Sequence, residues 1–273
     1  MNYLYKFIHS LLTNYKWIIH LNKKNNYGLI GNNIAYSLSP KIYEYWFNKY
    51  NIDEEYLLID INERELKADL INNYKGLNVT KPFKQRVIPF ISELSEEVKF
   101  TNAVNLIINK NNKTYGYNTD YLGLLDSYKY YNLDFKNKNI LILGAGGATR
   151  ALLYSLKDYD CNIYLYNRTK EKADSIIKDF TKLKIKEYND NIYYDIIFNA
   201  TSINFNEILN NLNIKKCDNI IYYDLNYYHN IDFRSNYIDG LYMLVAQAKH
   251  NFYKFFGIMP NVDDNIINYI KNK

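Results

Sequence analysis

A lysine and an aspartate are the residues of this chain best suited to move a proton. Lys84 ends the segment LNVTKPFK (77–84), and Asp120 lies within YNTDY (117–121). An amine held beside a carboxylate can exchange a proton with the oxygen of an alcohol or a ketone. The carboxylate would also hold the ammonium and limit a fall in the lysine pKa. The alternatives are an ordinary surface lysine and an aspartate that caps a helix.

The residues around Lys84 predict a ligand site at the end of a strand. Asn78 and Thr80 alternate with apolar residues and finish a predicted strand over 76–80. Open α/β sheets bind ligands at the carboxyl ends of their strands. Pro82 predicts a helix over 82–91, with Lys84 in its first turn. A cation there faces the positive end of the helix dipole, which favours the neutral amine.

Three further clusters carry polar groups that folding alone does not require. Ser37 and Ser39 place two hydroxyls in a loop before a predicted helix over 41–52, where Ser39 could cap the helix or face a ligand. Asn105 is an amide beside apolar residues in AVN (103–105). Gln247 lies among apolar residues of a predicted helix, and a hydroxylated ligand would supply the partners that a buried amide needs. An exposed glutamine at a face boundary is the alternative.

A second kind of site follows from ILILGAGGATRALLYSL (140–156). An apolar strand leads into Gly144, Gly146 and Gly147, and Ala148–Leu156 has helical spacing. Backbone N–H groups at such a helix start bind anions, above all the pyrophosphate of a dinucleotide. Glycines that serve only helix–strand packing are the alternative.

The next strand end indicates which dinucleotide. Asn167-Arg168-Thr169 stands where chains that bind NAD carry an acidic residue for the ribose hydroxyl. An arginine with flanking amide and hydroxyl donors would instead bind a 2′-phosphate, which predicts NADP. Lys172 could add a second positive charge, or it could be a solvated lysine on a charged helix face.

Composition excludes several other classes of protein. The chain has 273 residues, of which 48% are hydrophobic and 23% charged, and its net charge is +5 without a basic stripe. We therefore expect a globular protein that binds neither nucleic acid nor a membrane. Cys161 and Cys217 have no metal or redox spacing, which favours a reducing cytoplasm and no metal site. Residues 1–26 suit a short amphipathic helix better than a signal peptide.

Hydrophobic periodicity predicts strands that alternate with helices, and hence two mostly parallel α/β sheets. The predicted strands are 27–31, 55–61, 76–80, 103–109, 113–117, 140–143, 162–166, 183–187, 195–199 and 220–224, and the predicted helices are 41–52, 63–73, 82–91, 121–130, 148–156, 170–180, 243–256 and 263–272.

Taken in order, these motifs resemble the shikimate dehydrogenase family. The matching segments, which cover nearly all of residues 27 to 257, are GNNIAYSLSP, LNVTKPFK, AVN, NTD, GAGGATRA, NRT, NATS, YYDLNY and DGLYMLVAQA. The resemblance implies an α/β substrate domain over 27–125, completed by helices of 243–273, and a Rossmann-type NADP domain over 126–242. Residues 1–26 form an extension outside the pattern. It also implies reversible reduction of 3-dehydroshikimate to shikimate by NADPH in chorismate and aromatic amino-acid biosynthesis.

The resemblance also assigns roles to residues by position. Lys84 and Asp120 match the catalytic pair. Residues matching substrate binders are Ser37, Ser39, Asn78, Thr80, Asn105, Tyr227 and Gln247. Residues matching cofactor contacts are Gly144, Ala145, Gly146, Gly147, Ala148, Asn167, Arg168, Thr169, Lys172, Thr201, Ser202, Leu225 and Gly240. Among its departures, the chain has Asn102 where the family usually has glycine.

Two alternatives to this function remain open from the sequence. The same chemistry could act on quinate or use NAD, although Arg168 speaks against NAD. A binding protein without catalysis could use the same fold, but the presence of both Lys84 and Asp120 argues against it. The expected partner is a small molecule, bound by a monomer or a homodimer.

Overall fold

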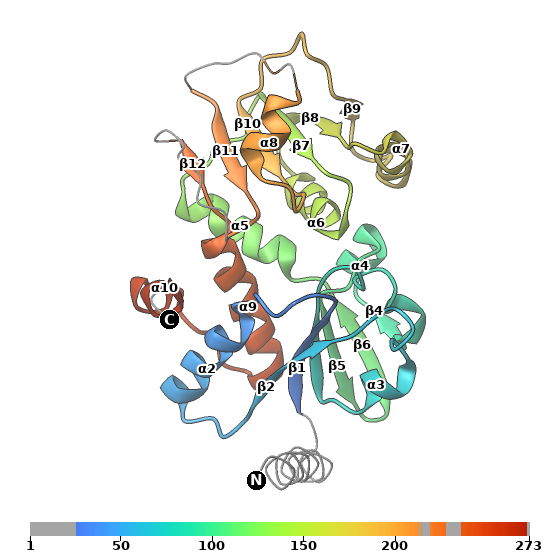
Figure 1. The fold of residues 1–273 in the computed structure, drawn as a ribbon, viewed down its shortest axis with the longest axis vertical. Coiled ribbons are helices and arrows are strands. Elements are labelled where there is room, and N and C mark those ends of the chain that lie inside the picture. The colour runs from blue at the N-terminus through green and yellow to red at the C-terminus, as the bar shows by residue number, and fades with distance from the viewer. Residues whose placement is uncertain (1–25, 213, 215–218, 228–235, 272–273) are drawn as a thin grey trace, which may run out of the picture.

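The computed structural model describes residues 26–212, 214, 219–227 and 236–271. Their elements, shown in Figure 1, are β1 (Tyr27–Gly31), α2 (Ser39–Tyr50), β2 (Tyr56–Asp60), α3 (Ala68–Asn72), β3 (Gly76–Val79), the 3₁₀ turn η1 (Ile88–Phe90), β4 (Glu93–Leu94), α4 (Glu96–Thr101), β5 (Leu106–Lys110), β6 (Lys113–Tyr117), α5 (Asp120–Tyr130), β7 (Lys138–Leu143), α6 (Gly147–Leu156), β8 (Cys161–Tyr166), α7 (Lys170–Asp179), β9 (Ile185–Glu187), β10 (Ile196–Asn199), α8 (Phe205–Asn210), β11 (Ile221–Asp224), β12 (Tyr237–Ile238), α9 (Leu241–Phe256) and α10 (Asp264–Lys271). The helix expected ahead of the first strand, and Cys217, lie outside the described residues.

The first sheet is mixed, with the order β2-β1-β3-β5-β6-β4. Strand β1 runs parallel to β2 and β3, whereas β5 pairs antiparallel with β3 and with β6. Asn111 and Asn112 join β5 to β6 with φ angles of 53° and 58°, as the tight turn of a hairpin requires. Both faces are covered: Leu29 packs with the helices, and its neighbour Ile30 packs in the opposite core with Phe83.

The second sheet has the strand order of dinucleotide-binding proteins. Its order is β12-β11-β10-β7-β8-β9, and every pair is parallel. Numbered from β7, this is 3-2-1-4-5-6 read from the β9 edge, the doubly wound arrangement. The last four residues of β7 form a continuous apolar run because Ile140 and Ile142 face one core while Leu141 and Leu143 face the other.

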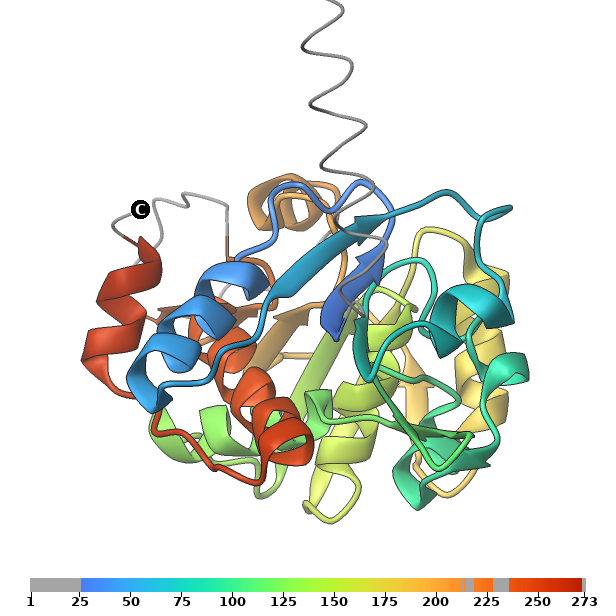
Figure 2. The same cartoon turned by 90° about the horizontal axis from the view of Figure 1, so that it is seen from below.

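Two helices connect the sheets. The chain leaves the first sheet through α5 and comes back from the second through α9, and these two helices pack against each other (Figure 1). Val245, Ala248 and Phe252 of α9 share one buried cluster with Tyr43 and Trp46 of α2. Figure 2 shows α2, α9 and α10 side by side along one flank. Helices α9 and α10 therefore pack against the first sheet, although the strands that precede them in sequence belong to the second sheet.

The predicted helix over 82–91 is wrong. These residues form turns and the short η1, and Pro82 follows a cis peptide bond. Phe83 and Val87 are buried four residues apart, a spacing that imitates a helix face. Pro89 explains the failure, because its ring clashes with the carbonyl of Gln85 in a helix and it lacks an N–H donor.

The other differences are smaller. The helix predicted over 63–73 is confined to α3, because Asn62 accepts a hydrogen bond from the Arg64 N–H and its own N–H binds Glu65. Such local bonds compete with a helix. Helices α4 and α8 and strands β4 and β12 were not predicted from the sequence. Asn102 ends α4 with φ 49°, which explains why glycine is the usual residue there.

Candidate active site

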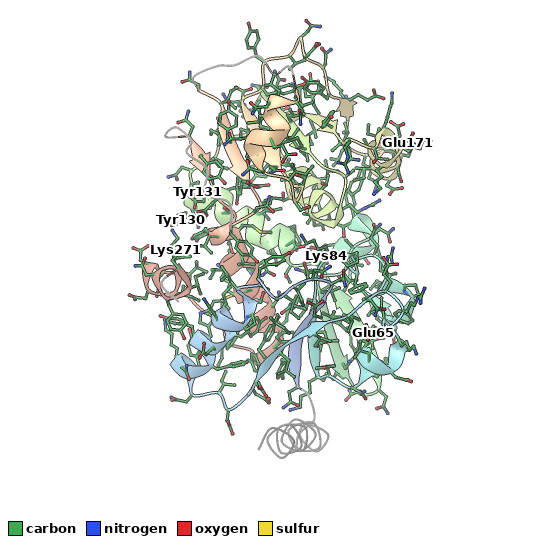
Figure 3. All side chains as sticks on the ribbon, in the orientation of Figure 1. Glu65, Lys84, Tyr130, Tyr131, Glu171 and Lys271 are labelled. Carbon is green, nitrogen blue, oxygen red and sulfur yellow. The ribbon has the colours of Figure 1, made fainter. Side chains whose placement is uncertain are left out.

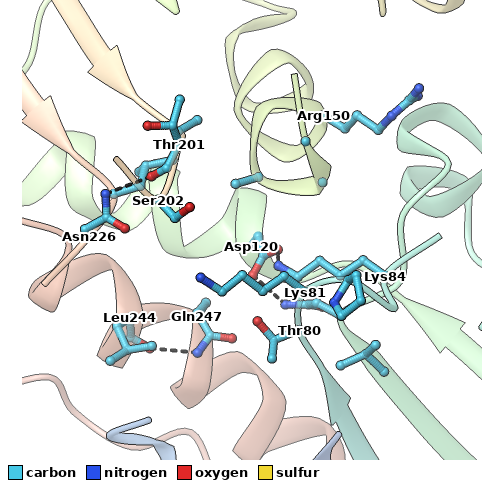
Figure 4. Close-up of a pocket in the computed structure, with 18 of the residues that line it drawn as sticks. Thr80, Lys81, Lys84, Asp120, Arg150, Thr201, Ser202, Asn226, Leu244 and Gln247 are labelled. Atoms are coloured by element: carbon cyan, nitrogen blue, oxygen red, sulfur yellow. Dashed lines mark hydrogen bonds and ion pairs between the residues drawn. The ribbon is translucent and has the colours of Figure 1, made fainter. Parts of the chain in front are cut away.

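A pocket lies between the two sheets. It is a cavity of about 700 Å³, lined by the ends of β1 and β3, the start of α6, the segments after β10 and β11, and the pocket-facing side of α9. Figure 4 shows these walls, with Thr80 and Gln247 on one side and Thr201 and Ser202 on the other. Both sheets contribute their strand ends, as expected for a ligand site in this class of fold.

Lys84 and Asp120 meet in this pocket although they lie 36 residues apart in sequence. The Lys84 Nζ is 2.5 Å from the Asp120 Oδ2, and their side chains are 18% and 8% exposed. The second carboxylate oxygen accepts a hydrogen bond of 2.7 Å from the Asn105 Nδ2. Figures 3 and 4 place Lys84 at the level between the two sheets. The pair is thus a fixed proton donor and acceptor with access to the cavity.

The structure places Lys84 and Asp120 differently from the helix positions considered for them from the sequence. Lys84 follows β3 in a turn, so the argument from a helix dipole at Pro82 does not apply. Its backbone carbonyl accepts the Val104 N–H at 2.7 Å, which anchors the turn. Asp120 is the first residue of α5, after the N-cap Thr119, so it is not the cap. A carboxylate in this first turn interacts favourably with the helix dipole.

The predicted hydroxyl and amide residues surround the pair. Ser37, Ser39, Asn78, Thr80, Asn105, Tyr227 and Gln247 all line the pocket. The Ser37 Oγ lies 3.2 Å from the Ser39 Oγ. Ser39 is the first residue of α2 and makes no capping bond, since Leu38 holds the N-cap position. The Ser37 Oγ also accepts the Ser39 N–H at 3.3 Å, so Ser37 serves both the start of α2 and the pocket wall, whereas the Ser39 hydroxyl makes no bond to the helix backbone.

Asn78 is held by two tyrosines that sequence reasoning missed. Its Oδ1 accepts the Tyr43 hydroxyl at 2.9 Å and the Tyr56 hydroxyl at 2.7 Å. The two rings stack 3.8 Å apart. Burial raises the pKa of both tyrosines well above the ordinary value, so both stay neutral donors. The side-chain amide of Asn78 also donates to the Asn105 carbonyl at 3.3 Å, which fixes its orientation.

The glycine turn forms the opposite wall. Gly144 has φ 110°, which favours glycine, and Gly146 is the N-cap of α6. Ala145, Gly146, Gly147 and Ala148 line the pocket, whereas Gly144 lies outside the lining. No acidic residue lies in the first turn of α6, so its N–H groups can hold a phosphate. A Cβ on Gly147 would come within 3.1 Å of the Lys84 Cδ, so the lysine stem packs on this turn.

Of the polar and basic residues predicted to bind the ribose phosphate after β8, only one lines the pocket. Lys172 lines the pocket, together with Ser175 of the same helix. Asn167, Arg168 and Thr169 lie outside the lining, at the end of β8 and the start of α7. The Asn167 Nδ2 donates to the Thr169 carbonyl at 2.8 Å, and Arg168 is exposed. Because β8 neighbours β7, this cluster lies beside the glycine turn, as a site for the ribose phosphate requires.

The remaining predicted residues follow β10 and β11. Thr201, Ser202 and Leu225 line the pocket. Gly240 does not line it, because it lies behind Leu225: a Cβ there would come within 2.3 Å of the Leu225 carbonyl oxygen. Sequence reasoning missed several other lining residues, among them Tyr36, Lys81, Arg150 and Asn226. Lys81 stands in the predicted NVTKPFK motif, so its proximity to Lys84 was a usable signal.

No helix in the described ranges is long and apolar enough to cross a membrane. Nor does that part of the chain bring together three side chains of the kinds that bind a metal.

These features define a two-domain α/β protein with a ligand pocket between a sheet of dinucleotide-binding order and a mixed sheet. Two family models match it: the shikimate dehydrogenase substrate binding domain over residues 29–107, and shikimate / quinate 5-dehydrogenase over residues 128–244. The chain belongs to the shikimate dehydrogenase family.

Individual proteins agree with this assignment. The shikimate dehydrogenase (NADP(+)) of Pelagibacter ubique (strain HTCC1062) is 38% identical over 265 residues, which cover 90% of this chain and 99% of the relative. That of Pyrococcus abyssi (strain GE5 / Orsay) is 36% identical over 252 residues, covering 87% and 94% of the two chains. The crystal structure of shikimate dehydrogenase from Aquifex aeolicus has a TM-score of 0.77 at 30% identity, covering 92% of this chain and 99% of that one.

Proposed function

We propose that this protein is an NADP-dependent shikimate dehydrogenase, which reversibly reduces 3-dehydroshikimate to shikimate in chorismate and aromatic amino-acid biosynthesis. The observation that carries the proposal is the Lys84–Asp120 pair at 2.5 Å, in a pocket whose opposite wall is the glycine turn. The relatives that cover most of the chain carry the name shikimate dehydrogenase (NADP(+)).

Lys84 and Asp120 are the proposed catalytic residues. The glycine turn and the residues that follow β8 and β10 would hold NADPH, which would supply the hydride for the carbonyl carbon of the substrate. The Lys84 ammonium gives a proton from Nζ to the carbonyl oxygen, which becomes the hydroxyl, and it recovers a proton from solvent. In the reverse direction the neutral amine accepts the hydroxyl proton. Asp120 holds the amine in place through its Oδ2, while Asn105 holds Asp120 through its Oδ1.

The residues around the pair suit a ring that carries hydroxyls and a carboxylate. Hydroxyl and amide side chains can donate to a carboxylate and exchange hydrogen bonds with hydroxyl groups. The proposed substrate-binding residues are Ser37, Ser39, Asn78, Thr80, Asn105, Tyr227 and Gln247. The side-chain N–H groups of Asn105 already donate to Thr119 and Asp120. Through this amide, Asn105 therefore positions the pocket wall rather than donating to the substrate.

The opposite wall fits a dinucleotide. The α6 start lacks acidic residues, and the turn before it consists of glycines and Ala145, whose side chain is a single methyl group. Arg168 and Lys172 supply positive charge for a 2′-phosphate. The proposed NADP-binding residues are Gly144, Ala145, Gly146, Gly147, Ala148, Asn167, Arg168, Thr169, Lys172, Thr201, Ser202, Leu225 and Gly240.

The domain limits also belong to this proposal. We propose a substrate domain over 27–125 that the helices of 243–273 complete, and an NADP domain over 126–242. The packing of α9 against α2 supports the first limit, and the all-parallel sheet supports the second. The backbone carbonyl of Asn26 accepts the Lys75 and Gly76 N–H groups, so this residue belongs with the substrate domain. We further propose that the protein works in the cytoplasm as a monomer or a homodimer.

Substrate and cofactor specificity test the proposal together. Purified protein is offered shikimate or quinate, each with NADP or NAD, and the appearance of reduced nicotinamide is followed by absorbance. We expect the highest kcat/KM with shikimate and NADP. Faster turnover of quinate would move the proposal to another substrate of the same chemistry, and a preference for NAD would remove Arg168 from cofactor recognition. Absence of turnover with all four pairs would refute it.

A further inference from the structure

The side-chain amide of Gln247 is held in one orientation by groups outside the pocket. Its Nε2 donates to the Leu244 carbonyl at 2.8 Å, a bond drawn in Figure 4. Its Oε1 accepts from the Asn251 Nδ2 at 2.9 Å. A backbone carbonyl can only accept, so the nitrogen of Gln247 must be the atom that faces Leu244. The second N–H of Nε2 is left for the pocket that Gln247 lines.

The same orientation follows independently from the catalytic side. The Thr119 backbone N–H can only donate, and it bonds to the Asn105 Oδ1 at 2.7 Å. The Asn105 Nδ2 therefore faces away from Thr119 N, and it donates to the Thr119 Oγ1 at 2.9 Å. Two acceptors lie within reach of the Thr119 hydroxyl proton, the Asn251 Oδ1 at 2.5 Å and the Asn105 Oδ1 at 3.2 Å, and the shorter distance favours Asn251.

These bonds form one directional chain from the catalytic carboxylate to Gln247. Asn105 joins Asp120 to Thr119, and Asn251 joins Thr119 to Gln247. Asn105, Thr119 and Asn251 are 3%, 1% and 1% exposed, so water does not compete for these bonds. The Asp120 end and the Gln247 end of this chain assign the same donor and acceptor atoms to each side-chain amide. An amide that rotated by 180° would therefore leave a polar group without its hydrogen-bond partner.

A close helix crossing makes the chain geometrically feasible. A Cβ on Gly123 of α5 would come within 2.7 Å of the Gln247 Cβ, so the helices touch where Gly123 meets Gln247. One helical turn away on each helix, Thr119 meets Asn251. Asn251 thus lies four residues after Gln247, on the same face of α9 and outside the pocket lining.

We propose that Asn251 is a positioning residue for shikimate recognition, which keeps the Gln247 Nε2 turned toward the substrate hydroxyls. The proposal rests on the proposed function for the identity of the substrate, and on the hydrogen-bond geometry alone for the contact. Without Asn251, the Gln247 Oε1 loses its partner and the bond to the Leu244 carbonyl is the one remaining anchor in this chain of bonds. The amide is then held less tightly, so its donor is offered to the substrate for a smaller part of the time.

A double-mutant cycle tests whether Asn251 acts through Gln247. We expect Asn251→Ala to lower kcat/KM for shikimate about 3–10-fold, the worth of one neutral hydrogen bond, mainly through KM. The KM for NADP should stay unchanged. In a Gln247→Ala background, Asn251→Ala should change kcat/KM by less than about twofold, because the interaction is already lost. The same fold loss in both backgrounds, or no loss in the single variant, would overturn the proposal.

Ser127→Ala is the matched control. Ser127 lies on α5, is fully buried, and bonds to the Tyr223 hydroxyl at 2.5 Å, outside this chain of bonds. It should lower the melting temperature as Asn251→Ala does and leave the KM for shikimate unaltered. Where Asn251→Ala fails to fold, Asn251→Asp keeps the acceptor for Thr119 but, as a carboxylate, cannot donate to Gln247. Asn251→Asp should raise the KM for shikimate, as we expect for Asn251→Ala, and a wild-type KM would contradict the proposal.

A readout without turnover separates this inference from the proposed function. The side-chain amide NMR signal of Gln247 is assigned by its disappearance in Gln247→Ala. We expect this signal to shift in Asn251→Ala and to stay in place in Ser127→Ala. A shift in a protein that does not oxidise shikimate would overturn the function and keep the positioning role, whereas an unshifted signal would overturn the positioning role.

Discussion

Replacing Lys84 with methionine removes the amine and keeps most of the side chain. The aliphatic stem of Lys84 lies against Gly147, so methionine preserves this contact where alanine would leave a gap. General acid–base assistance is worth about 10²–10⁴ in rate, or about 3–5 kcal/mol of activation free energy. We therefore expect Lys84→Met to lower kcat by that factor and to leave the dissociation constant for shikimate within a few fold.

The loss of the ion pair also has a predicted stability effect. The Lys84–Asp120 pair is mostly buried, with 18% and 8% of the two side chains exposed. Asp120 keeps the hydrogen bond from Asn105 at 2.7 Å and its place in the first turn of α5, so we expect a loss of about 1–3 kcal/mol. Chemical denaturation measures this free energy, and stopped-flow absorbance of a single turnover measures the chemical step.

Lys249→Met provides the matched control. Lys249 bonds to Asp126 at 2.7 Å, and the two side chains are 19% and 28% exposed, so its environment resembles that of Lys84 outside the pocket. It should lose comparable stability and keep its turnover. An unchanged kcat in Lys84→Met, or an equal fall of kcat in both variants, would refute the assignment of Lys84 as the proton donor.

Three further predictions use other parts of the structure. Gly147→Ala should lower kcat about 3–10-fold, because the added Cβ would lie 3.1 Å from the Lys84 Cδ and shift the amine; steady-state kinetics would show it, and normal turnover would contradict it. Burial raises the pKa of Asp126, but the hydrogen bonds and charges of His250 and Lys249 outweigh burial, so the pKa is lowered overall. Ionised Asp126 therefore stabilises the fold at pH values above the ordinary carboxyl pKa, and this stabilisation is lost as the pH falls through the pKa of the folded state. Asp126→Asn should therefore be less stable than the wild type by up to about 1 kcal/mol at neutral pH and equally stable in strong acid, as urea unfolding at both pH values would reveal. Burial, with a smaller contribution from Asp160, raises the pKa of Cys161 to about 11, so iodoacetamide should label it slowly in native protein at pH 8 and rapidly in urea; fast native labelling would be inconsistent with this environment.

The sequence was most informative where local pattern and topology agree. The run Ile140–Leu143 with its following glycines predicted a strand, a turn and a helix, and the structure has β7 and α6 there. A strand with both faces buried has a continuous apolar sequence, and the glycines after it are needed for backbone conformation. The strands predicted over 103–109 and 113–117 correspond to the β5–β6 hairpin, and Asn111 and Asn112 between them adopt the positive φ angles of its turn.

The sequence was least informative where distant elements decide the outcome. Pro82–Ile91 has the apolar spacing of a helix, but Pro89 prevents the helix and the core takes Phe83 and Val87 from a turn. Asn78 looked like a free polar group at a strand end, yet Tyr43 and Tyr56 hold it from a helix and an edge strand. Such partners depend on packing between elements, which local periodicity does not encode.

The role of α9 shows the same limit. Gln247 could be singled out from sequence as a polar group on an apolar face, but Asn251 could not, because its meaning depends on where α5 crosses α9. Gly123 allows that crossing, and nothing in its neighbourhood indicates which helix approaches it.

A crystal structure with shikimate and NADP bound together tests the central claim most directly. We expect the ring in the pocket between the sheets, with its reacting hydroxyl about 2.6–3.2 Å from the Lys84 Nζ and the pyrophosphate at the start of α6. Shikimate bound elsewhere, or bound with its reacting hydroxyl turned away from both Lys84 and Asp120, would contradict the account.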